Sequence, residues 1–146
     1  MSVSYLYAGK EHLEWLFIRE KDHNLTGEIL LKKIEQKEIL LAVLNKNPVG
    51  WLRFGYFWDT IPFMNLLFIL SDHRKKGIGK GLVLFWENEM KKQQYKLLLT
   101  STQSDENAQY FYRGLGYNDN GSLFLPDEMP EIFLIKKIRS LIFCYL

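Results

Sequence analysis

The sequence is short of cysteine, of long apolar runs and of excess charge. Its 146 residues include one cysteine, Cys144, so no intramolecular disulfide and no cysteine-based metal site can form. No apolar run approaches the roughly 18 residues that a membrane-spanning helix needs, and the N-terminus lacks the basic and apolar regions of a signal peptide. A formal net charge of +2 is too small to indicate nucleic acid as the main partner. We therefore expect a cytoplasmic protein with no nucleic acid or membrane partner.

Hydrophobic periodicity predicts one α/β (α+β) domain over residues 1–146, because no repeat, low-complexity tract or flexible linker interrupts the pattern. The predicted order is β-α-α-β-β-β-α-β-α-β-β, in which helices interrupt a mixed sheet. The strands are predicted at residues 3–8, 38–44, 49–58, 63–70, 96–102, 117–125 and 131–138. The helices are predicted at residues 11–19, from the cap Thr26 onward, at 78–93, and from 104–105 to about 115.

A basic, glycine-rich segment, residues 74–81, joins an apolar strand pattern to the strongest helical pattern in the chain. The first N–H groups of a helix have no internal partner, and glycines let a phosphate approach them, so this junction can bind an anion. Walker A is excluded because Gly81 follows Gly79-Lys80, and the dinucleotide fingerprint is excluded because Leu82 replaces its third glycine. An ordinary glycine-rich turn is the alternative.

Two segments carry a resemblance to a known family. Arg74-x-x-Gly77-x-Gly79 resembles the Gln/Arg-x-x-Gly-x-Gly/Ala pyrophosphate loop of the GNAT superfamily of N-acetyltransferases. Ala108-x-x-Phe111-Tyr112-x-x-x-Gly116-Tyr117 resembles its Ala-x-x-Phe-Tyr-x-x-x-Gly-Phe segment. Since the order of elements is also similar, the resemblance covers nearly the whole chain. It implies a mostly antiparallel central sheet with helices on both faces and acetyl-CoA as co-substrate.

The resemblance also implies the cofactor contacts. The backbone N–H groups of the loop, helped by the side chains of Arg74 and Lys75, would hold the pyrophosphate. These loop residues are Gly77, Ile78, Gly79, Lys80 and Gly81. The backbone of Phe68, Ile69 and Leu70 would pair with the pantetheine arm as an added strand does. Asn107 either bonds to the cofactor or, like Asp105, caps the following helix. The isolated histidines lack metal-ligand spacing, so no metal is expected.

Tyr112 is the residue we predict for catalysis. Transfer of an acetyl group expels the CoA thiolate, whose parent thiol has a pKa of about 8.5 against about 10 for tyrosine. A phenol beside the sulfur can donate a proton as charge develops there, and the matching tyrosine of the superfamily commonly does so. The alternative is a buried aromatic on the apolar face of a short helix.

The general base is less clear. Positions that are acidic in many members of the superfamily fall on Asn65 and Thr100, and neither is a carboxylate. Asp59, in a predicted turn, and Glu28, on the second helix, are candidate bases, with solvated surface carboxylates as the alternative. A third option is that an already neutral amine attacks without a base.

The acceptor side is predicted from the hairpin that borders the acceptor groove in this superfamily. Trp51, Arg53 and Tyr56 lie there and either line an aromatic acceptor pocket or pack in the core, and Arg53 could recognise an acidic group. The apolar segment 141–146 would cover a sheet edge or pack on a second subunit, giving a homodimer.

Two functions therefore stay open. One is an enzyme that transfers acetyl from acetyl-CoA directly to a primary amine, in a small molecule or a peptide, within a ternary complex. No cysteine lies near the two motifs to carry an acyl intermediate. The other is a non-catalytic acyl-CoA-binding or regulatory domain that has lost its base.

Overall fold

The computed structural model describes residues 2–139 and divides into two compact units. The first comprises Met1–Arg53 and Leu66–Val83, and the second comprises Phe54–Asn65 and Leu84–Leu146. The single domain expected for residues 1–146 stays a prediction. The apolar segment 141–146 lies outside the described residues, so its predicted role is not addressed by the structure.

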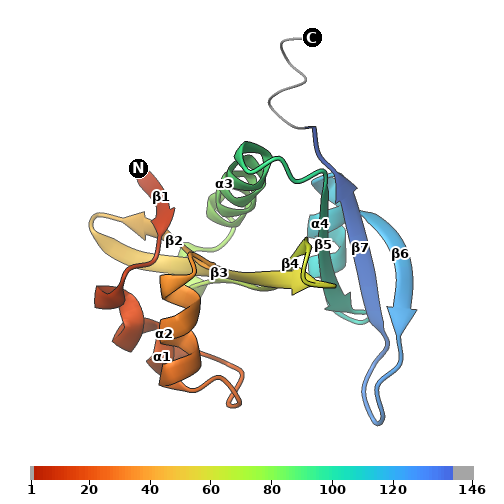
Figure 1. Cartoon of the computed structure of the whole chain (residues 1–146), viewed down its shortest axis with the longest axis horizontal. Helices are drawn as coiled ribbons and strands as arrows, with labels where there is room; N and C mark the ends of the chain where they lie inside the picture. The colour runs from red at the N-terminus through yellow and green to blue at the C-terminus, as the bar shows by residue number, and fades with distance from the viewer. Residues whose placement is uncertain (1, 140–146) are drawn as a thin grey trace. The chain divides into compact units, whose positions relative to one another are not determined.

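The strands form a seven-stranded sheet in the order β1-β2-β3-β4-β5-β7-β6 (Figure 1). Strands β4 and β5 are parallel, whereas the pairs β1–β2, β2–β3, β5–β7 and β6–β7 are antiparallel. This mixed, mostly antiparallel sheet confirms the predicted α/β (α+β) fold. The strands are β1 (Val3–Tyr7), β2 (Ile39–Leu44), β3 (Asn47–Phe57), β4 (Ile61–Ile69), β5 (Leu97–Gln103), β6 (Asn118–Leu123) and β7 (Glu131–Lys137).

The helices follow the predicted order, with two short 3₁₀ turns added. They are η1 (Lys10–His12), α1 (Leu13–Arg19), α2 (Gly27–Glu35), η2 (Ser71–His73), α3 (Ile78–Lys92) and α4 (Ala108–Gly114). The predicted cap of α2 is confirmed, because Thr26 Oγ1 accepts a hydrogen bond from the Ile29 N–H at 3.2 Å.

The first unit has its own core, where α1 and α2 lie side by side (Figure 1). Trp51 of β3 is 1% exposed, and its ring meets Trp15 edge-on at 5.4 Å and Phe68 at 5.1 Å. Aliphatic side chains from both helices and from β2 complete this cluster: Leu16, Leu30, Ile34, Ile39 and Leu41. Burial of these side chains is the main stabilising contribution in this unit.

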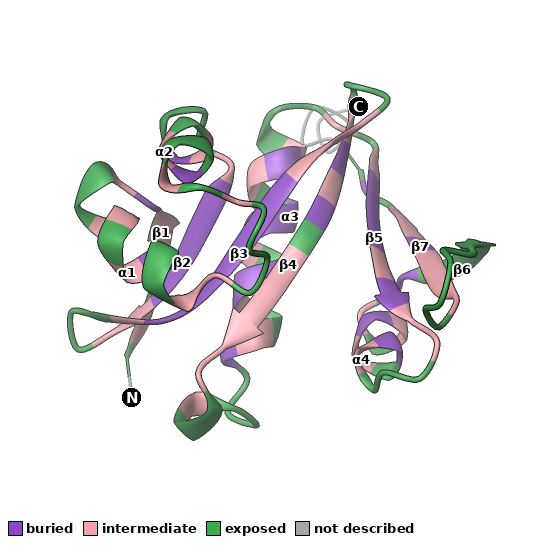
Figure 2. Cartoon of the chain, turned by 90° about the horizontal axis from the view of Figure 1, so that it is seen from below, coloured by how far each residue is buried: buried purple, intermediate pink, exposed green. Residues whose placement is uncertain are grey.

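The second unit is built around β5, which pairs with β4 through Phe63–Leu99 and Met64–Thr100. Most of β2, β3 and β5 is buried, whereas β6 is exposed along its whole length (Figure 2). Strand β6 is therefore an edge strand with a solvated face.

Two predicted boundaries are wrong for local reasons. The turn expected at residues 45–48 is a two-residue loop, with Asn45 and Lys46 at positive φ of 50° and 68°, as tight hairpin loops require. Pro48 instead belongs to β3 and pairs with Val43 of β2, beside a register shift that tolerates its missing N–H. Helix α4 begins at Ala108, later than predicted, because the Gln109 side-chain amide bonds to the carbonyls of Ser104 and Glu106 and holds them in a turn.

Candidate functional site

The glycine-rich loop opens α3 as the sequence predicts. Lys75 and Gly77 have positive φ of 61° and 82°, which turn the backbone between η2 and α3. The Gly77 carbonyl accepts the Gly81 N–H at 3.0 Å, so helical hydrogen bonding begins at Gly77. The N–H groups of Ile78, Gly79 and Lys80 precede that first bond and are the ones without a partner inside the helix. They are therefore the donors available to an anion.

The Gly81 N–H, predicted to bind phosphate, already donates to a carbonyl within the helix, and its predicted role stays a prediction. Gly81 has a different structural reason. A Cβ at this position would overlap with the phenol oxygen of Tyr5 on β1, and that oxygen donates to the Ile78 carbonyl at 3.4 Å. Gly81 thus makes room for a strand side chain at the first turn of α3.

Arg74 connects the loop to the end of β4. Its Nε donates to the Ile69 carbonyl at 2.8 Å, and its guanidinium carbon lies 5.0 Å from the centre of the Phe68 ring. The other N–H groups of the guanidinium provide further donors in a fixed plane. The loop lysines Lys75, Lys76 and Lys80 are exposed. Four cationic residues therefore lie within positions 74–80, at the start of α3.

The end of β4 approaches β3 closely. The Leu70 N–H donates to the Val49 carbonyl at 2.8 Å, and a Cβ on Gly50 would lie 2.8 Å from the Phe68 carbonyl oxygen. Phe68, Ile69 and Leu70, predicted to pair with pantetheine, are half-buried and fixed by these contacts. Their predicted role stays a prediction.

Tyr112 of α4 lies in the second unit and is 6% exposed. Its hydroxyl is 4.0 Å from the sulfur of Met64 on β4, and Thr100 Oγ1 donates to the Met64 carbonyl at 3.0 Å. Burial raises the pKa of the Tyr112 phenol to about 12, while a hydrogen bond with Thr100 lowers it and the charge of Glu106 raises it further. The phenol therefore stays protonated at neutral pH.

A buried polar cluster supports Tyr112 from behind, and sequence reasoning missed it. The Tyr117 ring meets that of Tyr112 edge-on at 5.9 Å, and its hydroxyl donates to Glu87 Oε2 at 2.9 Å. Lys136 Nζ donates to Glu87 Oε1 and to the Leu115 carbonyl, each at 2.8 Å. Burial, followed by the Glu87 charge, raises the pKa of Tyr117 above its ordinary range. The available sequence signal was Glu87, a charged residue directly after the buried Trp86 of α3.

The predicted base candidates lie at the surface. Glu28 is in the first turn of α2, and Asp59 is in the β3–β4 turn after Trp58, with both turn residues at positive φ. Both carboxylates are exposed, which agrees with the solvated alternative. A carboxylate that sequence reasoning missed is Glu131 on β7. Burial raises its pKa above the ordinary value of 4.5, against a hydrogen bond with Ser101 that lowers it.

The three residues predicted to contact the acceptor have different surroundings in the structure. Trp51 is in the core, and Arg53 is 7% exposed and bound to Glu20 Oε1 at 3.0 Å, so both take part in packing of the first unit. Tyr56 instead lines a pocket of about 230 Å³ in the second unit with Phe57, Phe63, Asn65 and Phe133. Asn65 is the position where the superfamily often has a carboxylate.

Asn107 does not cap α4 through its side chain, although it occupies the N-cap position. The capping alternative is therefore not supported for Asn107, and its predicted contact with the cofactor stays a prediction. Asp105 lies in the turn before the helix and is exposed.

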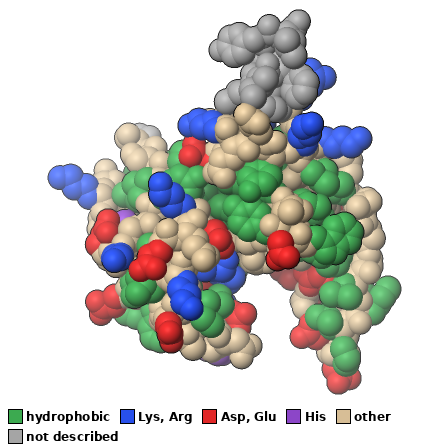
Figure 3. Space-filling model, viewed as in Figure 1, with side chains coloured by type: hydrophobic (Ala, Val, Ile, Leu, Met, Phe, Trp, Pro, Cys, Tyr) green, Lys and Arg blue, Asp and Glu red, His purple; other side chains and the backbone are tan. Residues whose placement is uncertain are grey.

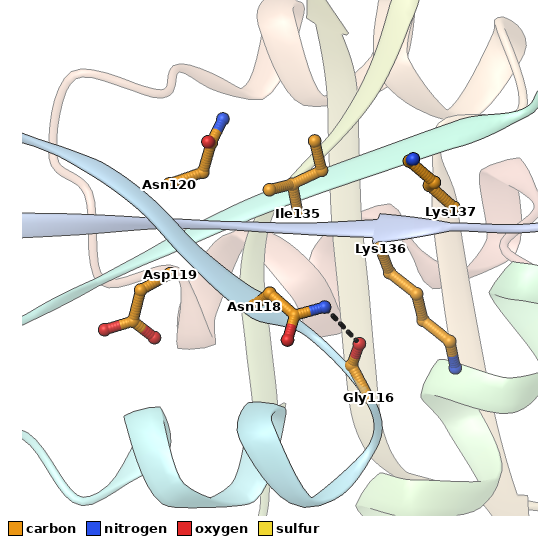
Figure 4. A pocket seen from close by; sticks show the side chains of 7 residues that line it. All are labelled: Gly116, Asn118, Asp119, Asn120, Ile135, Lys136 and Lys137. Atoms are coloured by element: carbon orange, nitrogen blue, oxygen red, sulfur yellow. Dashed lines mark hydrogen bonds between the residues drawn. The ribbon is translucent and has the colours of Figure 1, made fainter.

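A second pocket, of about 420 Å³, lies on β6 and β7 and contains none of the predicted site residues (Figure 4). Most of its lining residues are polar or charged, and the Asn118 amide donates to the Gly116 carbonyl at 3.4 Å. The adjoining β6–β7 loop exposes apolar side chains beside acidic ones (Figure 3). The apolar ones are Phe124, Leu125 and Met129, next to Leu123 at the end of β6.

Within residues 2–139, no three histidine, cysteine or acidic side chains gather as a metal site would require. No helix in that range has the length and apolar character to cross a membrane.

The sequence matches a known family of proteins. The model of the acetyltransferase (GNAT) family matches residues 7–117. YyaT, an uncharacterized protein of Bacillus subtilis (strain 168), is 31% identical over 107 residues, which are 71% of this chain and 68% of YyaT.

Two solved structures share the fold at low sequence identity. Ard1 from Thermoplasma volcanium has a TM-score of 0.80 at 14% identity, covering 94% of this chain and 99% of Ard1. The PaiA N-acetyltransferase from Thermoplasma acidophilum, in complex with coenzyme A, has a TM-score of 0.76 at 18% identity, covering 94% and 100%. The chain belongs to the GNAT family of acetyltransferases.

Proposed function

We propose that the protein transfers an acetyl group from acetyl-CoA directly to a primary amine. The observation that carries the proposal is the start of α3, where the N–H groups of Ile78, Gly79 and Lys80 precede the first helical hydrogen bond and four cationic residues lie within positions 74–80. This arrangement suits a pyrophosphate, since both the N–H groups and the helix dipole favour an anion there. The CoA complex of the PaiA relative supports the same ligand.

In the proposed reaction the neutral amine nitrogen attacks the thioester carbonyl carbon, the C–S bond breaks with its electron pair leaving on the CoA sulfur, and the nitrogen loses a proton to water. Tyr112 donates a hydrogen bond to the sulfur as negative charge develops there. With a pKa of about 12 the phenol holds its proton at neutral pH. Full transfer to a thiolate whose parent thiol has a pKa of about 8.5 is uphill, so Tyr112 acts chiefly by hydrogen bonding in the transition state.

Replacing Tyr112 tests the catalytic part of the proposal. We expect Tyr112→Phe to lower kcat by about 100-fold or more, the usual size of general-acid catalysis, while KM for acetyl-CoA changes little. Tyr110→Phe is the matched control, because Tyr110 lies on the same helix and is 65% exposed. A Tyr112→Phe enzyme with wild-type kcat over the full pH range would exclude this role.

A non-catalytic acyl-CoA-binding domain is the second candidate. It is favoured by Asn65 and by Thr100, whose hydroxyl is engaged with the Met64 carbonyl and is no base. Incubation with acetyl-CoA and a panel of amines, followed by assay of free thiol, separates the two. Saturation with CoA at 100 times Kd should stabilise either kind of protein by about 2.7 kcal/mol. Stabilisation without thiol release on any amine favours the binding domain, and no stabilisation excludes both functions.

A further inference from the structure

The pocket lined by Tyr56, Phe57, Phe63, Asn65 and Phe133 is almost entirely aromatic. Its walls come from the end of β3, the start of β4 and the middle of β7, all within the second unit. The volume of about 230 Å³ exceeds the roughly 150 Å³ of an apolar cavity known to hold benzene, so a six-membered ring with a short substituent fits.

The aromatic walls are held in place by one another. The Phe57 and Phe63 rings stack at 6.2 Å, and Phe63 meets Phe133 edge-on at 5.9 Å. Tyr56 is in turn packed against Tyr95 at 5.9 Å. Because these rings are fixed before a ligand arrives, a flat apolar group loses little binding free energy to ordering the pocket.

Asn65, which lines the pocket, follows directly after Met64 on β4, the residue that Tyr112 contacts. Successive side chains of a strand point to opposite faces of the sheet. Met64 faces Tyr112, and Asn65 therefore faces the other side, into the pocket. An acceptor seated on the Asn65 side would reach this strand from the face opposite to the proposed acid.

Charge further narrows the acceptor. None of the described residues that line the pocket carries a charge. A polycation would find no counter-charge among these lining side chains, whereas a flat apolar group meets aromatic faces and edges there.

We propose that the acceptor is a primary amine attached to an aromatic or flat apolar group, and that this group occupies the pocket. The inference rests on the proposed acetyl transfer and adds the chemical class of its acceptor. Arylalkylamines and peptides with an aromatic first residue share this chemistry.

Matched acceptors test the proposal. The three acceptors 2-phenylethylamine, ethanolamine and spermidine share an unhindered primary amine, and only the first carries an aromatic ring. We therefore expect kcat/KM for 2-phenylethylamine to exceed the values for the other two by tenfold or more. Parallel assays on two peptides that differ only in a first residue of phenylalanine or serine distinguish a peptide from a small-molecule acceptor. A preference for ethanolamine or spermidine would overturn the acceptor class and leave acetyl transfer standing.

Two variants connect the preference to the pocket. Phe133→Leu keeps an apolar wall but removes the ring, and should raise KM for 2-phenylethylamine about three- to tenfold with little change in kcat. Phe133→Ala should raise it about tenfold or more. Phe124→Leu is the control, because Phe124 is 76% exposed in the β6–β7 loop outside the pocket. CoA-induced thermal stabilisation, unchanged in all three variants, shows that they fold.

Binding measured without turnover separates failure of this inference from failure of the proposed function. Saturation-transfer NMR should detect 2-phenylethylamine on the CoA-loaded wild type and a weakened signal on Phe133→Leu. Binding lost with the ring but no thiol release would retain the aromatic-amine pocket and overturn the transferase. An unchanged signal or an unchanged KM in Phe133→Leu would overturn the pocket assignment.

Discussion

Three glycines in or near the proposed cofactor loop are each required for a different structural reason. Gly77 adopts a φ of 82° with no atom near its missing Cβ, so only backbone conformation requires glycine there. Gly50 allows β3 and the end of β4 to approach each other. Gly81 makes space for the Tyr5 phenol. Replacing each of these glycines therefore tests a different physical effect.

Gly81→Ala should destabilise the protein through a specific overlap with Tyr5, and shortening that side chain should relieve it. We expect Tyr5→Leu with Gly81→Ala to cost less than the sum of the two single changes, by about 0.5–3 kcal/mol, as coupled neighbours do. Urea unfolding of the four proteins measures this difference. Gly77→Ala, which has no such neighbour, should cost about 1–2 kcal/mol irrespective of Tyr5. Strict additivity of Gly81→Ala and Tyr5→Leu would contradict the packing explanation.

At the scale of elements, the cluster of Glu87, Tyr117 and Lys136 joins α3, the segment between α4 and β6, and β7. The Glu87 side chain is 3% exposed, so its charge depends on the two donors that it receives. An unsatisfied buried acceptor is costly, which makes each donor important to the packing of α4. Tyr117 also replaces the phenylalanine of the family segment, so its hydroxyl is a feature of this chain.

Tyr117→Phe should destabilise the protein by about 1–3 kcal/mol even though phenylalanine is the residue of the family segment, because Glu87 loses a buried donor. For a chain of this size the Tm should fall by several degrees. Glu87→Gln should also destabilise the protein, since it leaves the Lys136 ammonium, 2.8 Å away, without its counter-charge. Calorimetry on the two variants checks both expectations, and an unchanged Tm in Tyr117→Phe would contradict this role.

Sequence patterns predicted the elements whose local and tertiary preferences agree. The apolar spacing of α3 and the Thr26 cap each have one dominant local cause, and both appear in the structure. The start of α4 was misplaced because the Gln109 side chain holds the preceding residues in a turn. That contact has no signature in the sequence.

The sequence likewise predicted one part of the candidate site and missed another. The loop and the tyrosine helix are contiguous motifs, so a resemblance could locate them. The aromatic pocket joins Phe63 to Phe133, which are far apart in the chain and meet only because β7 follows β5 in the sheet. Arg53 was misleading because a buried partner, Glu20, lies 33 positions away and could not be paired with it from sequence.

For the whole molecule, two carboxylates shift the pH dependence of stability in opposite directions. The Arg113 guanidinium bonds to Asp119 at 2.8 Å through two N–H groups and lowers the pKa of that carboxyl below 3.8. Its contribution to stability is present above pH 3.8 and is lost as the pH falls through its folded-state pKa. Because this pair is exposed, salt screens it and its effect is small.

The raised pKa of Glu131 has the opposite effect on the pH dependence of stability, and it should be the larger of the two effects. Burial, followed by the charges of Glu106 and Glu128, holds its pKa above 4.5 against the Ser101 hydrogen bond. A raised carboxyl pKa means that the folded state binds the proton more tightly, so its favourable contribution is complete below pH 4.5 and is lost as the pH rises through the folded-state pKa. Glu131→Gln should therefore raise Tm at pH 7 by a few degrees at most, and the gain should vanish near pH 4. Thermal unfolding scans of the wild type and of Glu131→Gln from pH 3.5 to 8 measure this trend. A gain that stays constant with pH would show that the substitution acts through packing or hydrogen bonding and not through the charge of Glu131.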